Sequence, residues 1–180
     1  SIVALQEIRW KDAGELRKKD FTIYYSGDVK EGHKGTAFYV NKIARESVIA
    51  FEPINERICY LKLKRKFQNI SLVNVYAPTE ESSQEEKDQF YDKLDGVCRK
   101  ISRHDVTIVL GDLNAQVGKE DFVKQTAGNH SLHNTSNDNG IRLCSFAQSN
   151  NFWISSVSFQ HKNIHKQTWK LPGRRGATQI

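Results

Sequence analysis

Short strand-like segments recur along most of the chain. Runs of β-branched and aromatic residues predict strands at residues 2–5, 21–25, 36–40, 47–51, 57–63, 70–76, 106–110 and 152–155. Within 57–63, apolar Cys59, Leu61 and Leu63 alternate with Tyr60 and Lys62, which is typical of a sheet with one face in water. The run 106–110 is apolar nearly throughout, which predicts a strand in the middle of a sheet.

Two segments have the periodicity of amphipathic helices. The first begins after Ser82 and Ser83, which favour an N-cap, and its apolar face carries Phe90, Leu94, Val97 and Ile101. The second begins near Asn139–Gly140 and ends at Asn150–Asn151. A further short helix is expected between residues 10 and 19. Because strands and helices alternate without a long linker or an internal repeat, we expect a single α/β domain over residues 1–180.

The composition is that of a soluble globular domain. Of 180 residues, 38% are hydrophobic and 27% are charged. The apolar runs are too short to cross a bilayer, so we expect no membrane association. The three cysteines lack the spacing of a metal site, which favours a reduced, intracellular location.

The two ends of the sequence look like interruptions of a larger domain. The chain contains no Met, begins within a predicted strand and stops as another strand begins at Thr178–Ile180. We therefore expect a fold that is truncated at both ends.

Charge is distributed unevenly along the chain. Residues 139–180 contain no acid, and their bases are Arg142, Lys162, Lys166, Lys170, Arg174 and Arg175. Cations close to Trp153 and Trp169 suit a phosphate backbone and exposed bases, although a solvated basic surface has the same composition. The run Lys62–Lys66 is also basic, but its alternation within a hairpin favours a solvated strand face.

Polar side chains follow three of the apolar strands. Gln6–Glu7 ends the first, Asn74 and Tyr76 end the strand before Pro78, and Asp112 and Asn114 follow Gly111. A carboxylate there can bind a cation or a water, an amide can hold a phosphate oxygen, and a tyrosine hydroxyl can donate to phosphate. Each strand end taken singly is also compatible with a structural turn.

Taken in order, these motifs resemble those of the endonuclease/exonuclease/phosphatase superfamily. Later segments are similar to the apurinic-type endonuclease domain of non-LTR retrotransposons of the LINE class, in particular the cow-type (RTE) elements and the craniofacial development (Bucentaur) family derived from them. These segments are Asn137–Leu143, His161–Trp169, Pro172–Gly173 and Gln179–Ile180. The resemblance covers essentially the whole chain. It implies a two-sheet α/β sandwich flanked by helices.

The resemblance also implies roles for individual residues. Glu7 would bind Mg²⁺, with Mn²⁺ as an alternative, Tyr76 would contact the scissile phosphate with Asn74 beside it, and Asp112 and Asn114 would position the attacking water. The residues implied in DNA binding are Arg142, Lys166, Thr168, Trp169, Arg174 and Arg175. The implied activity is nicking of double-stranded target DNA by a nuclear monomer that needs no organic cofactor.

Further motif residues of that family do not occur in this sequence. They are an Asn ahead of Ser1, an Asp directly after Ile180 and a later Asp-His pair. We therefore expect these 180 residues alone to have little nicking activity. Two other functions stay open, namely a phosphatase of the same fold and a non-catalytic remnant that binds DNA or a protein partner.

Overall fold

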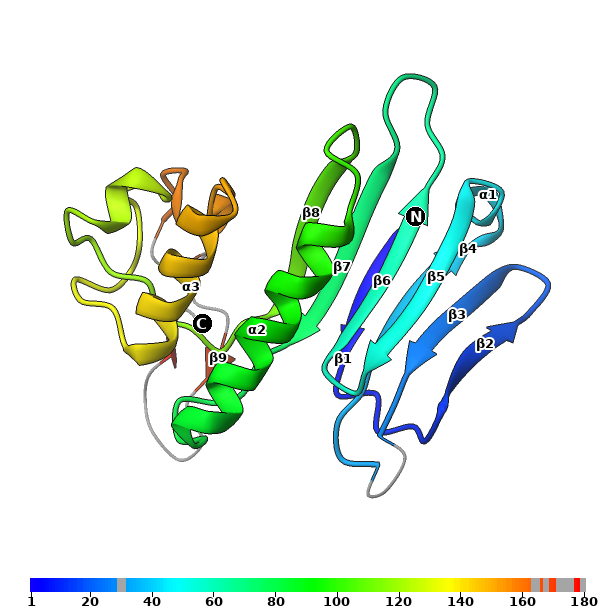
Figure 1. The fold of residues 1–180 in the computed structure, drawn as a ribbon, viewed down its shortest axis with the longest axis horizontal. Helices are drawn as coiled ribbons and strands as arrows, with labels where there is room; N and C mark the ends of the chain where they lie inside the picture. The colour runs from blue at the N-terminus through cyan, green and yellow to red at the C-terminus, as the bar shows by residue number, and fades with distance from the viewer. Residues whose placement is uncertain (29–31, 163–165, 167–168, 171–176, 179–180) are drawn as a thin grey trace. The chain divides into compact units, whose positions relative to one another are not determined.

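The chain divides into two compact units. A computed structural model describes residues 1–28, 32–162, 166, 169–170 and 177–178 (Figure 1). The first unit comprises Ser1–Ala77 and Gly96–Asp112, and the second comprises Pro78–Asp95 and Leu113–Ile180.

The first unit is built on two four-stranded sheets. The first sheet is antiparallel with the order β1-β4-β3-β2, formed by β1 (Ile2–Gln6), β4 (Thr36–Asn41), β3 (Phe21–Ser26) and β2 (Ala13–Arg17). The second has the order β5-β6-β7-β8, formed by β5 (Val48–Asn55), β6 (Ile58–Leu63), β7 (Ile70–Tyr76) and β8 (Val106–Asp112). Its β5–β6 and β6–β7 pairs are antiparallel, and its β7–β8 pair is parallel. The short helix α1 (Lys42–Arg45) connects β4 to β5.

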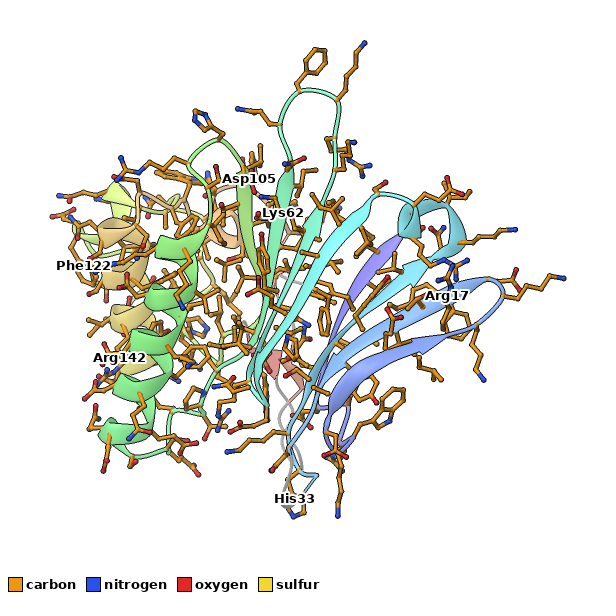
Figure 2. All side chains as sticks on the ribbon, turned by 45° about the vertical axis from the view of Figure 1, so that its right-hand side comes forward. Arg17, His33, Lys62, Asp105, Phe122 and Arg142 are labelled. Atoms are coloured by element: carbon orange, nitrogen blue, oxygen red, sulfur yellow. The ribbon has the colours of Figure 1, made fainter. Side chains whose placement is uncertain are left out.

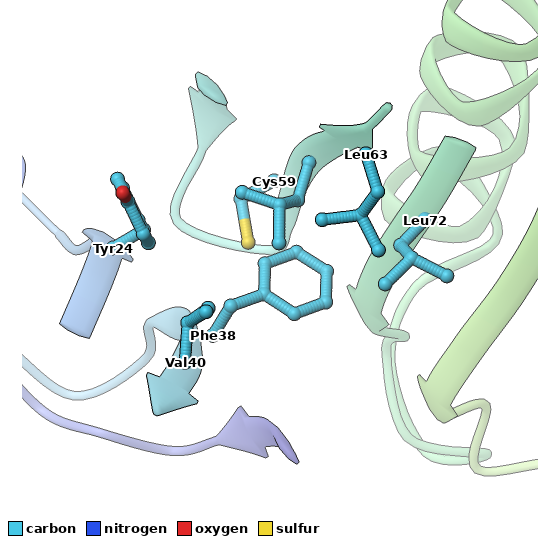
Figure 3. Close-up of a cluster of buried hydrophobic side chains, with 7 residues drawn as sticks. Tyr24, Phe38, Val40, Cys59, Leu63 and Leu72 are labelled. Carbon is cyan, nitrogen blue, oxygen red and sulfur yellow. The ribbon is translucent and has the colours of Figure 1, made fainter. Parts of the chain in front are cut away.

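The core lies between these two sheets. Figure 3 shows Phe38 among side chains of both sheets. The buried cluster consists of Tyr24, Phe38 and Val40 from the first sheet and Cys59, Leu61, Leu63 and Leu72 from the second. The alternation predicted for residues 57–63 is therefore confirmed at Cys59, Leu61 and Leu63, which point into the core.

The second unit contains the remaining helices. The long helix α2 (Gln84–Lys100) starts in this unit, and α3 (Asp138–Ser149) follows the irregular segment 113–137. Two 3₁₀ turns, η1 (Val123–Gln125) and η2 (Ser155–Val157), and the strand pair β9 (Trp169–Lys170) and β10 (Ala177–Thr178) complete its described elements. Both long helices begin and end within a few residues of their predicted bounds. Over the described residues, no helix is both long and apolar enough to cross a membrane.

Three local predictions are wrong. Residues 13–17 form strand β2, not a helix, because they pair with β3 from Ala13↔Ser26 to Arg17↔Thr22. Residues 152–155 do not form a strand, because Ile154 makes a single bridge to Ala127 before η2 begins. Within the described residues, β8 lies at the edge of its sheet and not in the middle, and its Val106 and Ile108 side chains are 45% and 44% exposed.

Candidate active site

Three side chains from different strands meet at one end of the first unit. Tyr76 and Asp112 close the parallel β7–β8 ladder as directly opposite residues, so their side chains lie on the same face of the sheet. The Tyr76 hydroxyl donates a hydrogen bond to Glu7 Oε1 at 2.9 Å. Glu7 follows β1, which belongs to the other sheet. The Glu7 side chain therefore meets Tyr76 within the first unit, and Asp112 lies beside Tyr76 in the adjacent strand.

Each oxygen of the Glu7 carboxylate has a partner among the described residues. Glu7 Oε1 accepts from Tyr76, and Glu7 Oε2 lies 3.3 Å from the Arg9 guanidinium. Glu7 has a left-handed backbone with φ of 52°, a conformation that costs free energy for a residue with a side chain. The turn that follows β1 therefore holds this carboxylate in a defined position beside Tyr76.

Tyr76 lies in a strongly charged environment. Burial and the hydrogen bond to Glu7 raise the Tyr76 pKa above its ordinary value, and the negative charge of Asp112 raises it further. The Arg57 guanidinium acts in the opposite direction. Arg57 lies 5.4 Å from the centroid of the Tyr76 ring and donates from Nη1 to the Tyr76 carbonyl at 3.1 Å. Tyr76 is therefore a neutral hydroxyl donor at physiological pH, in contact with the Glu7 carboxylate and the Arg57 guanidinium.

Asn74 connects the two sheets beneath this cluster. Its side chain is fully buried, and its Nδ2 donates to the carbonyls of Leu5 at 3.0 Å and Ala37 at 2.8 Å. Its Oδ1 accepts from Gln6 Nε2 at 2.7 Å. All three partners belong to the first sheet, whereas Asn74 lies in β7. The amide therefore fixes the end of β1, and with it Glu7, against the strand that carries Tyr76.

Gly111 allows Asp112 to reach its position beside Tyr76. It has φ of 133°, and a Cβ at this residue would lie 2.0 Å from the Val75 carbonyl oxygen. A larger residue would push β8 away from β7 at the point where the site forms. Close backbone packing thus explains the glycine of the Gly-Asp-x-Asn motif formed by residues 111–114.

Asn114 belongs to the second unit, where α3 holds its backbone. Asn139 is buried, and its Nδ2 donates to the carbonyls of Asn114 at 2.9 Å and Pro78 at 3.0 Å. Asn137 caps α3 by accepting from Gly140 N, and the same oxygen accepts from Gln116 N at 3.0 Å. The Asn137–Gly140 segment therefore fixes the loop that follows the Gly-Asp-x-Asn motif.

The residues predicted to bind DNA lie in the second unit. Arg142 bonds within that unit to Asp138 at 3.0 Å and also to Asp88 and Gln84. Lys166 and the β9 residue Trp169 are among the described residues. Thr168, Arg174 and Arg175 lie outside them.

The donor set of the cluster is compatible with a hard divalent cation. Within the described part of the chain, no group of three or more His, Cys, Asp or Glu side chains is arranged to hold a metal ion. Glu7 nevertheless accepts a hydrogen bond from the Tyr76 hydroxyl, and Asp112 lies directly opposite Tyr76 in the adjacent strand. Mg²⁺ is commonly bound by one or two carboxylates, with waters and substrate phosphates as its other ligands. These two carboxylates fit that pattern.

Residues 1–173 match the Endonuclease/Exonuclease/phosphatase family. The chain belongs to this family. It is 32% identical over 179 residues to craniofacial development protein 2 of Bos taurus and 31% identical over 179 residues to that of Tragulus javanicus. Both matches cover 99% of this chain, but only 30% and 31% of the two relatives. The chain thus spans about a third of the length of these curated relatives.

Two solved structures share the fold. The endonuclease domain of TRAS1, a telomere-specific non-LTR retrotransposon, superimposes with a TM-score of 0.59 at 16% identity, over 88% of this chain and 63% of that one. An AP endonuclease from Leishmania major gives 0.56 at 13% identity, over 83% and 57%. The predicted two-sheet α/β sandwich is confirmed by these neighbours.

Two residues near Tyr76 and Asn114, namely Arg57 and Asn139, cannot be identified as functional from the sequence. Arg57 reads only as the start of a strand, and no local pattern reveals that it packs on Tyr76. Asn139 belongs to a family-like segment, but the motif assigns it no role. Asn139 lies two residues after the N-cap Asn137 and directly before Gly140. This position is the one sequence signal that the N-terminus of α3 packs against the backbone of another segment.

Proposed function

We propose that the chain carries the phosphodiester-hydrolysing centre of a Mg²⁺-dependent DNA endonuclease. The observation that supports this most directly is the hydrogen bond from Tyr76 to Glu7, with Asp112 opposite Tyr76 in the adjacent strand. Two carboxylates and a neutral hydroxyl donor at the ends of three strands form a compact site for a cation and a phosphate. Membership of a hydrolase family that includes endonucleases agrees with this activity.

In this proposal each side chain has a distinct task. Glu7 and Asp112 would hold the metal, which when bound supplies Lewis-acid stabilisation of the phosphate oxygens. Tyr76 would turn its hydroxyl from Glu7 to a phosphate oxygen and would stay protonated as it does so, because its pKa is raised. Asp112, with Asn114 from the following loop, would orient the attacking water. Gln6 and Asn74 would keep Glu7 in position.

The DNA would be double-stranded target DNA, bound by a monomer in the nucleus. The cations and aromatic residue assigned to it are Arg142, Lys166, Trp169, Arg174 and Arg175, together with Thr168. Two features support this assignment. The acid-free segment 139–180 contains these residues, and the structural neighbours are named as endonucleases.

Conversion of supercoiled plasmid to nicked circles in Mg²⁺ tests the proposal. The assay uses the natural chain that contains these residues, including any flanking segments. We expect Glu7→Gln, Tyr76→Phe and Asp112→Asn each to lower the nicking rate by about 10²-fold or more. Two matched controls, Glu46→Gln at an exposed position and Tyr39→Phe, should retain the activity.

Two results would contradict the proposal. Release of inorganic phosphate from a phosphomonoester without plasmid nicking would assign a phosphatase. DNA binding without hydrolysis in any divalent metal would assign a non-catalytic binding domain.

A further inference from the structure

The hairpin between β6 and β7 carries an unusual combination of side chains. Residues 64–69 are Lys, Arg, Lys, Phe, Gln and Asn, and the first five are exposed. Phe67 is 89% exposed, the largest value among the large hydrophobic side chains of the described residues. We call Lys64, Arg65, Lys66 and Phe67 the hairpin patch. An apolar ring in water at a loop tip gains nothing from folding, so a stability role does not explain it.

Figure 2 shows this hairpin extending beyond the sheet, with Lys62 and Asp105 near its base. The acid at the base is already engaged, because Asp105 Oδ2 lies 2.8 Å from Lys62 Nζ and accepts from Ser71 Oγ at 2.8 Å. Across the residues that the structure describes, neither Lys64 nor Lys66 forms an ion pair with a carboxylate. The positive charge of these two lysines therefore faces solvent.

Other cations reach the same end of the second sheet. β8 runs parallel to β7 with Ile70 opposite Val106, so the connection from α2 enters the sheet beside the hairpin. Val106 N donates to the Asn69 carbonyl at 2.9 Å, and exposed Lys100 and Arg103 precede it. Exposed cations therefore lie on both segments that lead into this end of the sheet, although residues 1–138 have as many acids as bases.

The hairpin patch is separate from the candidate active site. β7 begins at Ile70 next to the patch and ends at Tyr76. At about 3.3 Å per residue, the two ends of this strand are about 20 Å apart. A ligand at the patch is therefore distinct from the phosphate that Tyr76 would contact.

We propose that the hairpin patch binds a single-stranded segment of nucleic acid, with Phe67 stacking on an unpaired base. Flat apolar rings beside cations are the recurring elements of single-strand binding, since every base has a face on which an aromatic ring can stack. The Lys66 ammonium lies 5.4 Å from the centroid of the Phe67 ring, so charge and ring are presented together. Lys64 and Lys66 supply the phosphate contacts.

Fluorescence anisotropy with a labelled 12-nucleotide deoxythymidine strand and with a duplex of equal length tests this proposal. The measurements use the full chain in EDTA, so that neither metal binding nor cleavage contributes. We expect Phe67→Ala to weaken binding of the single strand about tenfold and to leave duplex binding nearly unchanged. Phe67→Trp should restore it. Because Phe67 is exposed at a loop tip, the alanine variant should unfold at the same temperature as the parent chain.

The lysines are tested by the salt dependence of the same binding. Lys64→Ala/Lys66→Ala should reduce the slope of log affinity against log salt by about 1.4, the value for two phosphate contacts of a single strand. The matched control Lys11→Ala/Lys93→Ala removes two exposed cations elsewhere and should leave the slope unchanged.

Three results would overturn the proposal. In the first, the Phe67→Ala variant binds the single strand as tightly as the parent chain does. In the second, the substitution weakens binding of the duplex as much as binding of the single strand. In the third, it weakens binding to phosphatidylserine vesicles but not to the single strand, which would assign the patch to a membrane surface.

Discussion

At the residue scale, the chemistry of the candidate site depends on how its neighbours set the protonation of Tyr76. The hydroxyl donates to the Glu7 carboxylate, Asp112 lies opposite Tyr76 in the adjacent strand, and the Arg57 guanidinium lies over the Tyr76 ring. The two carboxylates raise the pKa of Tyr76, which helps its hydroxyl to stay protonated beside a phosphate, and the guanidinium limits this rise. The three groups therefore make opposing and separable contributions.

Substitutions of Arg57 and of Glu7 should move the pKa of Tyr76 in opposite directions. Removing the Arg57 charge by Arg57→Gln should raise the pKa, because a cation favours the phenolate. Glu7→Gln should lower it, because the carboxylate disfavours that charge. NMR titration of chains with ¹³Cζ-labelled tyrosine measures both shifts, with Tyr76→Phe to assign the resonance. Shifts of the same sign in the two variants would contradict the geometry of the site.

Cysteine reactivity gives a second prediction at this scale. Burial raises the pKa of the Cys59 thiol to about 12, and burial also raises the pKa of Cys144. Cys98 is only half-buried. Since the thiolate is the reactive form, Ellman's reagent at pH 8 should modify Cys98 first in the folded chain and all three cysteines rapidly in urea. Cys98→Ser should abolish the fast reaction, and a fast phase that survives would show that the core around Cys59 is open.

At the element scale, the start of α3 determines how the loop after the Gly-Asp-x-Asn motif packs. Asn137 and Asn139 together bind the backbone of Asn114, Gln116 and Pro78. Gly140 brings the helix close enough for these bonds, because a Cβ on it would lie 2.0 Å from the Gln116 carbonyl oxygen. Helix and loop therefore form one structural element around Asn114.

Two helical glycines should respond to alanine with opposite signs. A Cβ added at Gly96 in α2 would meet no atom within 4 Å, so Gly96→Ala should increase the free energy of unfolding by about 0.5–1 kcal/mol. Gly140→Ala should decrease it by about 1–3 kcal/mol, because the methyl group meets a backbone oxygen. Urea denaturation followed by circular dichroism measures both. Equal effects would mean that helix propensity alone governs the two positions.

At the scale of the whole molecule, the fold separates positive from negative side chains within a segment whose summed charge is zero. Residues 139–180 hold the net excess of positive charge. Residues 1–138 are neutral in sum, yet the fold places exposed cations at the hairpin end of the first unit and carboxylates at the Tyr76 end. The two basic regions are therefore expected to contact different nucleic-acid structures.

Duplex DNA binding should depend on the C-terminal cations. Replacement of Lys166, Lys170, Arg174 and Arg175 by Ala should reduce the salt slope for duplex binding by about 0.9 for each phosphate that is no longer neutralised, or roughly 3 to 4 in total. Lys64→Ala/Lys66→Ala should change this duplex slope little. Anisotropy between about 50 and 200 mM salt measures both. An unchanged slope in the fourfold variant would assign the C-terminal cations to solvation.

Much of the local structure follows from the sequence alone. The strand at residues 70–76 is observed with the predicted bounds, and α2 and α3 start beside their predicted N-terminal signals. These elements were predictable because side-chain periodicity and capping act over a few residues. The order of the Glu7, Tyr76 and Asp112 motifs likewise indicated the family.

Other features were decided only by tertiary contacts. Residues 13–17 became a strand because they pair with β3. Residues 152–155 did not, because within the described part of the chain they form only the bridge from Ile154 to Ala127. Asn74 reads as a polar residue at a strand end, but the packing of the two sheets buries it and uses its amide to hold β1. The partners of Tyr76 are 19 and 69 positions away in sequence. Periodicity along the sequence specifies which face of a strand or helix a side chain occupies. The pairing of strands that are distant in sequence decides which residues that face contacts.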